Sequence, residues 1–251
     1  MHPYDLHVGR YGSQLAAGML ELAGVSRGDR VLDVGCGTGQ LTIALAEAVG
    51  ARNVTAIDPS EQVLEACRSR VPEADVRPAS AESLPFAEAG FDAVLAQLVV
   101  NLTGDPPGAV REMRRVARPD APVVACFWDD EEMPLLRSYW DACREVAPES
   151  LAEVDEQAQV GLADVEVLRE WWTGAGLREV ALGELEVAAE YESFDDLWFS
   201  FEAGVGHSGA LYLSLDPERQ RAVRADAHRR LGSPDGPFRL VAKARTVRGV
   251  G

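Results

Sequence analysis

The segment 31–40 places three glycines at alternate positions, directly after a short apolar run that contains an acid. Glycines at positions 35, 37 and 39 permit backbone conformations with positive φ and let a ligand approach the main chain closely. The apolar run predicts a strand, and Leu41 to Val49 predict a helix whose free N–H groups point back at the glycines. The segment therefore predicts a backbone cradle for a nucleoside-type cofactor.

Apolar runs alternate with helical patterns through the first half of the chain. Strands are expected at Arg30–Val34, Asn53–Asp58, Asp75–Pro78, Phe91–Leu98 and Val123–Trp128, and helices at Leu41–Val49, after Ser60 and at Pro107–Val116. This alternation is typical of an α/β fold with a parallel sheet covered by helices on both faces.

The alternation breaks after Trp128. Helices are expected at Met133–Val146, Val165–Ala175, Phe194–Phe201 and about 217–231, strands at Arg178–Tyr191 and Phe238–Val247, and a flexible loop at Gly204–Gly209. The last strand is expected at or near the edge of the sheet. The length of 251 residues fits a single domain over 1–251, with an N-terminal lid at 1–24 and a helical insert at about 130–176.

The charge and the cysteines limit the partners and the compartment. A formal net charge of −17 opposes binding to nucleic acid and to anionic membrane surfaces. The sequence has no membrane-spanning stretch and no signal peptide pattern, which predicts a cytoplasmic protein. The four cysteines are isolated from one another, so they predict buried thiols rather than disulfides or a metal site.

The glycine spacing separates two classes of cofactor. A dinucleotide fingerprint needs G-x-G-x-x-G, but Gln40 occupies the place of its third glycine, and the spacing here is G-x-G-x-G. The carboxylate of Asp33 suits an ammonium group better than a pyrophosphate. These features favour a cationic ligand.

Four motifs in order resemble the class I S-adenosylmethionine-dependent methyltransferases, in the form common among small-molecule enzymes related to quinone-biosynthesis C-methyltransferases. They are the glycine loop, Asp58 at the end of the second strand, the Ala81–Phe86 run, and Gln97–Leu98 after the fourth strand. The resemblance covers roughly residues 4–128. It implies a Rossmann-like, seven-stranded, mostly parallel sheet with an antiparallel final strand, and S-adenosylmethionine as the cofactor, with S-adenosylhomocysteine as product.

The resemblance also assigns roles to residues. The glycine loop would pass under the methionine part of the cofactor, Asp58 would bind the ribose hydroxyls, Glu82 would lie along the adenine, and Tyr11 would belong to a covering N-terminal element. The implied cofactor contacts are Tyr11, Asp33, Gly35, Cys36, Gly37, Gly39, Asp58, Pro59, Ala81, Glu82, Gln97 and Leu98. Simpler interpretations stay open: Asp58 as a helix cap, Glu82 as a solvated acid, and Tyr11 as packing on the first helix.

Methyl transfer needs alignment of the acceptor with the S–CH₃ bond and exclusion of water, whereas a dedicated base is not compulsory. His207 is the candidate catalytic residue, with an ordinary loop histidine as its alternative. The candidate acceptor contacts are Tyr4, Asn101, Trp128 and Trp198, although a core position is the favoured interpretation of Trp198. His228 is expected at the surface.

The predicted function is methyl transfer to an O, N or C atom of a small molecule by a monomer or homodimer that binds neither nucleic acid nor membrane. Two alternatives remain. One is a protein that binds S-adenosylmethionine without transferring a methyl group, or that has a regulatory role. The other is an NAD-dependent oxidoreductase, against which stand Gln40 and the lack of an obvious Tyr-x-x-x-Lys relay.

Overall fold

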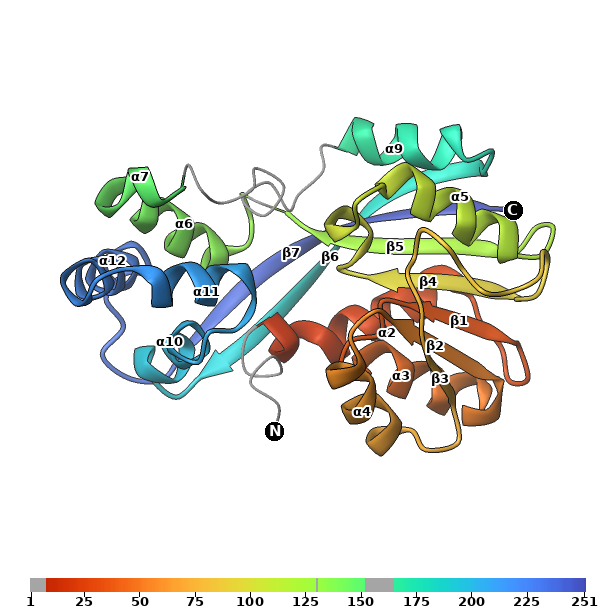
Figure 1. The fold of residues 1–251 in the computed structure, drawn as a ribbon, viewed down its shortest axis with the longest axis horizontal. Helices are drawn as coiled ribbons and strands as arrows, with labels where there is room; N and C mark the ends of the chain where they lie inside the picture. Colours follow the sequence, from red (N-terminus) through yellow and green to blue (C-terminus); the bar gives the residue numbers. More distant parts are fainter. Residues whose placement is uncertain (1–7, 130, 152–164) are drawn as a thin grey trace. The chain divides into compact units, whose positions relative to one another are not determined.

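The computed structural model describes residues 8–129, 131–151 and 165–251 (Figure 1). Tyr4 and the part of the predicted insert at 152–164 lie outside the described residues. The chain divides into two compact units. We call the first the sheet unit, with described residues 12–127, 165–185 and 244–251, and the second the helical unit, with described residues 8–11, 128–129, 131–151 and 186–243.

Seven strands form one sheet in the order β3-β2-β1-β4-β5-β7-β6. Their bounds are β1 Val31–Val34, β2 Val54–Asp58, β3 Asp75–Pro78, β4 Ala93–Gln97, β5 Pro122–Trp128, β6 Arg178–Tyr191 and β7 Phe238–Val250. Strands β1 to β5 pair in parallel, with Val31 opposite both Val54 and Ala93. The prediction of a mostly parallel α/β sheet is confirmed.

The last strand runs antiparallel to β5. In the sheet unit Gly251 exchanges backbone hydrogen bonds with Asp120 and Ala121, each of 3.0 Å, and in the helical unit the N–H of Asp129 donates to Lys243 O at 3.0 Å. The high residue numbers of β7 thus lie opposite the low residue numbers of β5, as antiparallel pairing requires. Strand β7 lies between β5 and the edge strand β6, which confirms the prediction of a last strand at or near the edge.

The helices of the sheet unit are α2 Gly12–Ala23, α3 Gln40–Val49, α4 Glu61–Arg70, α5 Pro106–Val116 and α9 Val165–Gly174, with short 3-10 turns η2 Ala51–Asn53 and η3 Val100–Leu102. Helices α3, α4, α5 and α9 follow the predicted positions closely, whereas α2 lies in the segment that was predicted only as a lid. Helix α5 begins where Asp105 accepts the N–H of Gly108 at 2.9 Å. Trp172 of α9 is fully buried and donates its indole N–H to Val123 O at 3.2 Å, which anchors α9 in the core.

The helical unit contains η1 Val8–Tyr11, α6 Pro134–Val146, α7 Pro148–Leu151, α10 Phe194–Glu202, α11 Gly206–Ser214 and α12 Pro217–Arg230. Its core is aromatic: Trp198 is 1% exposed, and its ring lies 6.1 Å from Tyr139, 4.7 Å from Phe201 and 5.5 Å from Tyr212. This packing agrees with the favoured interpretation of Trp198 as a core residue.

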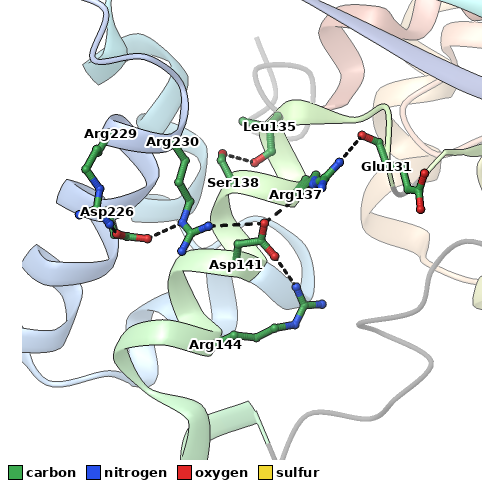
Figure 2. Close-up of polar contacts among 9 residues, drawn as sticks. All are labelled: Glu131, Leu135, Arg137, Ser138, Asp141, Arg144, Asp226, Arg229 and Arg230. Carbon is green, nitrogen blue, oxygen red and sulfur yellow. Dashed lines mark hydrogen bonds and ion pairs between the residues drawn. The ribbon is translucent and has the colours of Figure 1, made fainter.

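An ionic network joins α6 to α12 (Figure 2). Asp141 of α6 lies 2.7 Å from Arg144 and 3.7 Å from Arg230, and Arg230 in turn lies 2.5 Å from Asp226. Asp226 also pairs with Arg229. The side chain of Asp226 is 8% exposed, so the network fixes the buried side of α12 against α6.

The predicted flexible loop at Gly204–Gly209 is wrong, because α11 begins at Gly206. A Cβ atom on Gly209 would lie 2.5 Å from the carbonyl carbon of Gly204. This glycine therefore serves close packing of the helix on the preceding turn, not flexibility. Strand β4 also begins later than predicted, because Phe91 forms only an isolated bridge, with Ala117. Among the described helices none is both long and apolar enough to cross a membrane.

Candidate cofactor site

The glycine loop leaves β1 and enters α3 with all three glycines at positive φ, +74° at Gly35, +52° at Gly37 and +95° at Gly39. A Cβ on Gly35 would lie 2.4 Å from Val99, and one on Gly39 would lie 3.0 Å from the Cys67 sulfur. A Cβ on Gly37 would meet no atom within 4 Å. Packing thus requires two of the glycines, whereas the third borders open space.

Asp58, at the end of β2, is held toward this loop by the main chain. Its Oδ2 accepts the N–H of Gly37 at 3.1 Å, and its Oδ1 accepts the N–H of Ser60 at 2.9 Å. Each carboxylate oxygen keeps a further lone pair for another donor. Pro59, beside it, is exposed. The carboxylate thus binds the N–H of Ser60, the N-cap residue of α4, and also faces the glycine loop, while its ribose role stays a prediction.

Asp33, in β1, is fully buried. Its Oδ2 accepts the hydroxyl of Thr42 at 2.6 Å, while its Oδ1 has no hydrogen-bond partner among the described residues. Burial raises the pKa of Asp33 to about 8, against the opposing effect of the Thr42 hydrogen bond. Burying a hydrogen-bond acceptor without a partner costs free energy, so we expect a ligand to donate a hydrogen bond to this oxygen.

The end of β4 supplies a second such acceptor. Gln97 donates from Nε2 to Gly12 O at 3.3 Å, and its buried Oε1 has no hydrogen-bond partner in the described part of the chain. Leu98 follows with φ of +60°, a left-handed backbone that is unfavourable for a branched residue. Unfavourable backbone of this kind clusters at ligand sites.

The loop after β3 carries Ala81, which is buried, and Glu82, which is half-buried. Glu82 accepts the hydroxyl of Ser80 and the N–H of Gly104, the latter at 2.8 Å. The hydrogen bond from Ser80 holds the pKa of Glu82 below its usual value. The carboxylate is therefore an ordered, ionised acceptor rather than a freely solvated acid.

Two residues of α5 fasten this loop, and sequence reasoning missed both. Glu112 accepts the N–H of Leu84 at 2.9 Å, and Arg115 donates to the carbonyl oxygens of Leu84 at 2.9 Å and Phe86 at 2.8 Å. Glu112 and Arg115 also pair with each other at 2.7 Å. Thr42, which orients Asp33, was missed as well. No local pattern marks these residues, because each acts on a segment distant in sequence.

Cys36, in the glycine loop, is buried. Its N–H and that of Gly35 both donate to Ile57 O at 2.8 Å, and its side chain is 7% exposed beside Cys67 in a small apolar cluster. All four cysteines are buried free thiols, which confirms that prediction. Within the described residues no group of His, Cys, Asp and Glu side chains is arranged to hold a metal ion.

The predicted lid contact Tyr11 and the predicted catalytic and acceptor residues are divided between the two units. Tyr11 is fully buried in the helical unit, with its hydroxyl 3.3 Å from that of Tyr191 and its ring 5.3 Å from Trp128. His207 is exposed in the first turn of α11. Asn101 is half-buried in η3 of the sheet unit. The structure brings Tyr11 and Trp128 together.

The site in the sheet unit fits S-adenosylmethionine. The free space at Gly37 admits a ligand against the backbone, and the unpartnered oxygens of Asp33 and Gln97 can accept N–H groups such as those of an ammonium. The remaining lone pairs of Asp58 can accept two hydroxyl groups. The ammonium and the ribose hydroxyls of such a molecule therefore have matching acceptors in the sheet unit.

Comparisons with known proteins agree with this geometry. A family model described as a methyltransferase domain matches residues 32–125. A demethylmenaquinone methyltransferase from Clavibacter sepedonicus is 33% identical over 61% of this chain and 67% of its own length. A malonyl-acyl-carrier-protein O-methyltransferase from Erwinia pyrifoliae is 34% identical over 52% of this chain and 49% of its own. The chain spans about half the length of several such relatives.

Solved structures share the fold at lower identity. A methyltransferase-like protein from Bacillus halodurans is 17% identical, with a TM-score of 0.59 over 94% of this chain and 97% of its own. The 4+2 cyclase SpnF is 20% identical, with a TM-score of 0.57 over 93% of this chain and 80% of its own. The same fold thus occurs in proteins with different named activities.

Proposed function

Since the chain belongs to the S-adenosylmethionine-dependent methyltransferases, we propose that it transfers the methyl group of S-adenosylmethionine to an O, N or C atom of a small-molecule acceptor. The observation that carries the proposal is the glycine loop, where the open side of Gly37 adjoins the oriented carboxylate of Asp58. Gly24 also borders open space, so what distinguishes Gly37 is the carboxylate of Asp58, which the N–H of Gly37 holds beside that space.

Binding of the cofactor falls to the ends of β1, β2 and β4. Asp58 accepts the two ribose hydroxyls, and Gly35, Gly37 and Gly39 let the methionine portion lie against the main chain. Asp33 accepts the ammonium group, which replaces the missing partner of its buried oxygen. Each contact holds the cofactor in one orientation, which is the main requirement of this reaction.

Further contacts would come from loops beside these strands. Glu82 and Ala81 would lie along the adenine, Gln97 and Leu98 beside the methionine, and Cys36 and Pro59 would adjoin the bound cofactor. The bound cofactor supplies an electrophilic methyl on a sulfonium. An acceptor held in line with that bond, away from water, reacts without a compulsory base.

We assign His207 to the acceptor side, as a base that removes a proton from a phenol, enol or ammonium. Asn101, Trp128, Tyr4 and Tyr11 complete the acceptor and lid contacts in this proposal. The His207→Ala variant tests it: turnover should fall while affinity for S-adenosylhomocysteine stays the same. Normal turnover would show that His207 is an ordinary exposed histidine without a role in the reaction.

The net charge of the chain and its free cysteines support proposals for its partners and its compartment. A net charge of −17 opposes nucleic acid, so the acceptor is a metabolite, and the protein acts as a monomer or homodimer. Four buried free cysteines suit a reducing compartment, which supports a cytoplasmic location. Light scattering of the purified protein with and without S-adenosylhomocysteine tests the oligomeric state.

A second candidate keeps the cofactor but not the methyl transfer, because a cyclase shares the fold. The two functions separate in one experiment. The protein is incubated with S-adenosylmethionine labelled in the methyl group and with panels of phenols, quinols, amines and carboxylic acids, and label is followed into product. Tight binding with no label transfer to any class would favour the second candidate, and labelled product establishes the first.

A further inference from the structure

The helical unit contains a pocket of about 500 Å³ that none of the candidate cofactor residues lines. It lies among the start of α10, one face of α12 and the residues that follow α12. Pockets of roughly 300–1,000 Å³ are the usual size for small-molecule ligands. The volume therefore suits a metabolite.

Helix α12 builds one preformed wall of this pocket. Arg221, Ala225 and His228 recur at helical spacing along a single face. Asp216 caps the helix by accepting two N–H groups, at 2.9 and 3.0 Å. His228, expected at the surface, is half-buried: its Nε2 lies 3.2 Å from Pro234 O. These contacts hold the wall in place without a ligand.

The floor of the pocket is apolar. Phe194 is 7% exposed, with its ring 4.5 Å from that of His228 and 5.4 Å from that of Trp198. Ala225 and Pro234 extend this surface. The floor therefore offers a place for an apolar group.

Four charged side chains line the pocket: two form an ion pair, and two have no partner among the described residues. Arg224 pairs with Asp195, and its guanidinium lies 5.4 Å above the Phe194 ring. Arg221 and Asp235 have no hydrogen bond or ion pair to any residue that the structure describes. Two arginines and two aspartates sum to zero at the pocket, in a chain whose net charge is −17.

We infer that this pocket binds a small zwitterion of the α-amino acid class with an apolar side group. The carboxylate of such a ligand pairs with Arg221, its ammonium pairs with Asp235, and its side group covers the floor. A simple anion would leave Asp235 unpaired and a simple cation would leave Arg221 unpaired. A zwitterion satisfies both charges and keeps the pocket neutral.

The test is a calorimetric titration of the full chain with three probes that share one ring. L-phenylalanine carries both charges, 3-phenylpropanoate lacks the ammonium, and 2-phenylethylamine lacks the carboxylate. L-phenylalanine should bind saturably, and the two analogues about tenfold more weakly, as the loss of one charged hydrogen bond predicts. Equal binding of either analogue would overturn the inference, as would no saturable binding of L-phenylalanine.

Variants locate the binding, because an α-amino acid also suits the charges of the cofactor site. Arg221→Gln and Asp235→Asn should each weaken L-phenylalanine binding about tenfold. Arg219→Gln is the matched control, since it alters the same helix outside the pocket. Unchanged affinity in the first two variants would place the ligand elsewhere and refute the assignment. The readout is binding alone, so it stands or falls separately from methyl transfer.

Discussion

Replacing Gly37 with alanine should separate the folding role of the glycine loop from its binding role. The new Cβ meets no protein atom within 4 Å, so the folded protein accommodates it sterically. The φ of +52° is unfavourable for alanine by about 1–2 kcal/mol. The variant should therefore fold, with a free energy of unfolding lower by that amount.

Binding should suffer more than folding, because the methyl group fills the space that the ligand occupies in this account. Inserting one methyl into a closely packed contact costs about 1–3 kcal/mol, which corresponds to a loss of affinity of roughly 5- to 150-fold. Calorimetric titration with S-adenosylhomocysteine measures the affinity, and urea unfolding followed by circular dichroism measures the stability.

Gly24→Ala is the matched control. Gly24 has a similar φ of +63°, and its Cβ would also meet nothing within 4 Å, but it follows α2 and lies outside the glycine loop. Both variants should lose similar stability, and only Gly37→Ala should lose affinity. Unimpaired binding by Gly37→Ala would refute the account of the open side of the loop.

Three further outcomes are expected. Asp58→Ala should weaken S-adenosylhomocysteine binding by about 1–3 kcal/mol, measured by calorimetry, since charged hydrogen bonds are lost; unaltered affinity would remove the ribose assignment. Burial raises the pKa of Asp33 to about 8, so the neutral carboxyl is the form that the folded protein favours. The stability that this group contributes is complete below the ordinary pKa of about 4 and is lost as pH rises toward 8. The free energy of unfolding should therefore fall across that pH range relative to Asp33→Asn. Parallel pH profiles of the two proteins would contradict this. Asp226→Ala should lower the free energy of unfolding by about 1–3 kcal/mol because it breaks a buried ionic network, whereas the exposed Asp195→Asn should change it little; equal effects would disprove the role of the network.

The sequence predicts the sheet well because strands such as Ala93–Gln97 and Pro122–Trp128 are almost entirely apolar and alternate with regular helices. It fails where a residue serves a distant partner. Gly209 reads as a loop residue, yet it is needed for contact with Gly204 in a helical turn. In the sequence alone, a glycine of a flexible loop cannot be distinguished from a glycine that close packing requires, because the difference lies in tertiary contacts.

The same limit applies to the candidate site. Gly35 and Asp58 could be predicted because each lies at the end of an apolar strand and Gly35 belongs to a local glycine repeat. Glu112 and Arg115 could not, since they act on the main chain of residues 28 to 31 positions earlier. The raised pKa of Asp33 could not be predicted either, because it depends on burial and on the hydrogen bond from Thr42.

In the proposed function the glycine loop and Asp58 bind an adenosyl sulfur cofactor. The decisive measurement is a calorimetric titration of the purified chain with S-adenosylmethionine, S-adenosylhomocysteine and NAD, in parallel. We expect saturable binding of the first two ligands and none of NAD. Binding of NAD alone, or of none of the three, would contradict it.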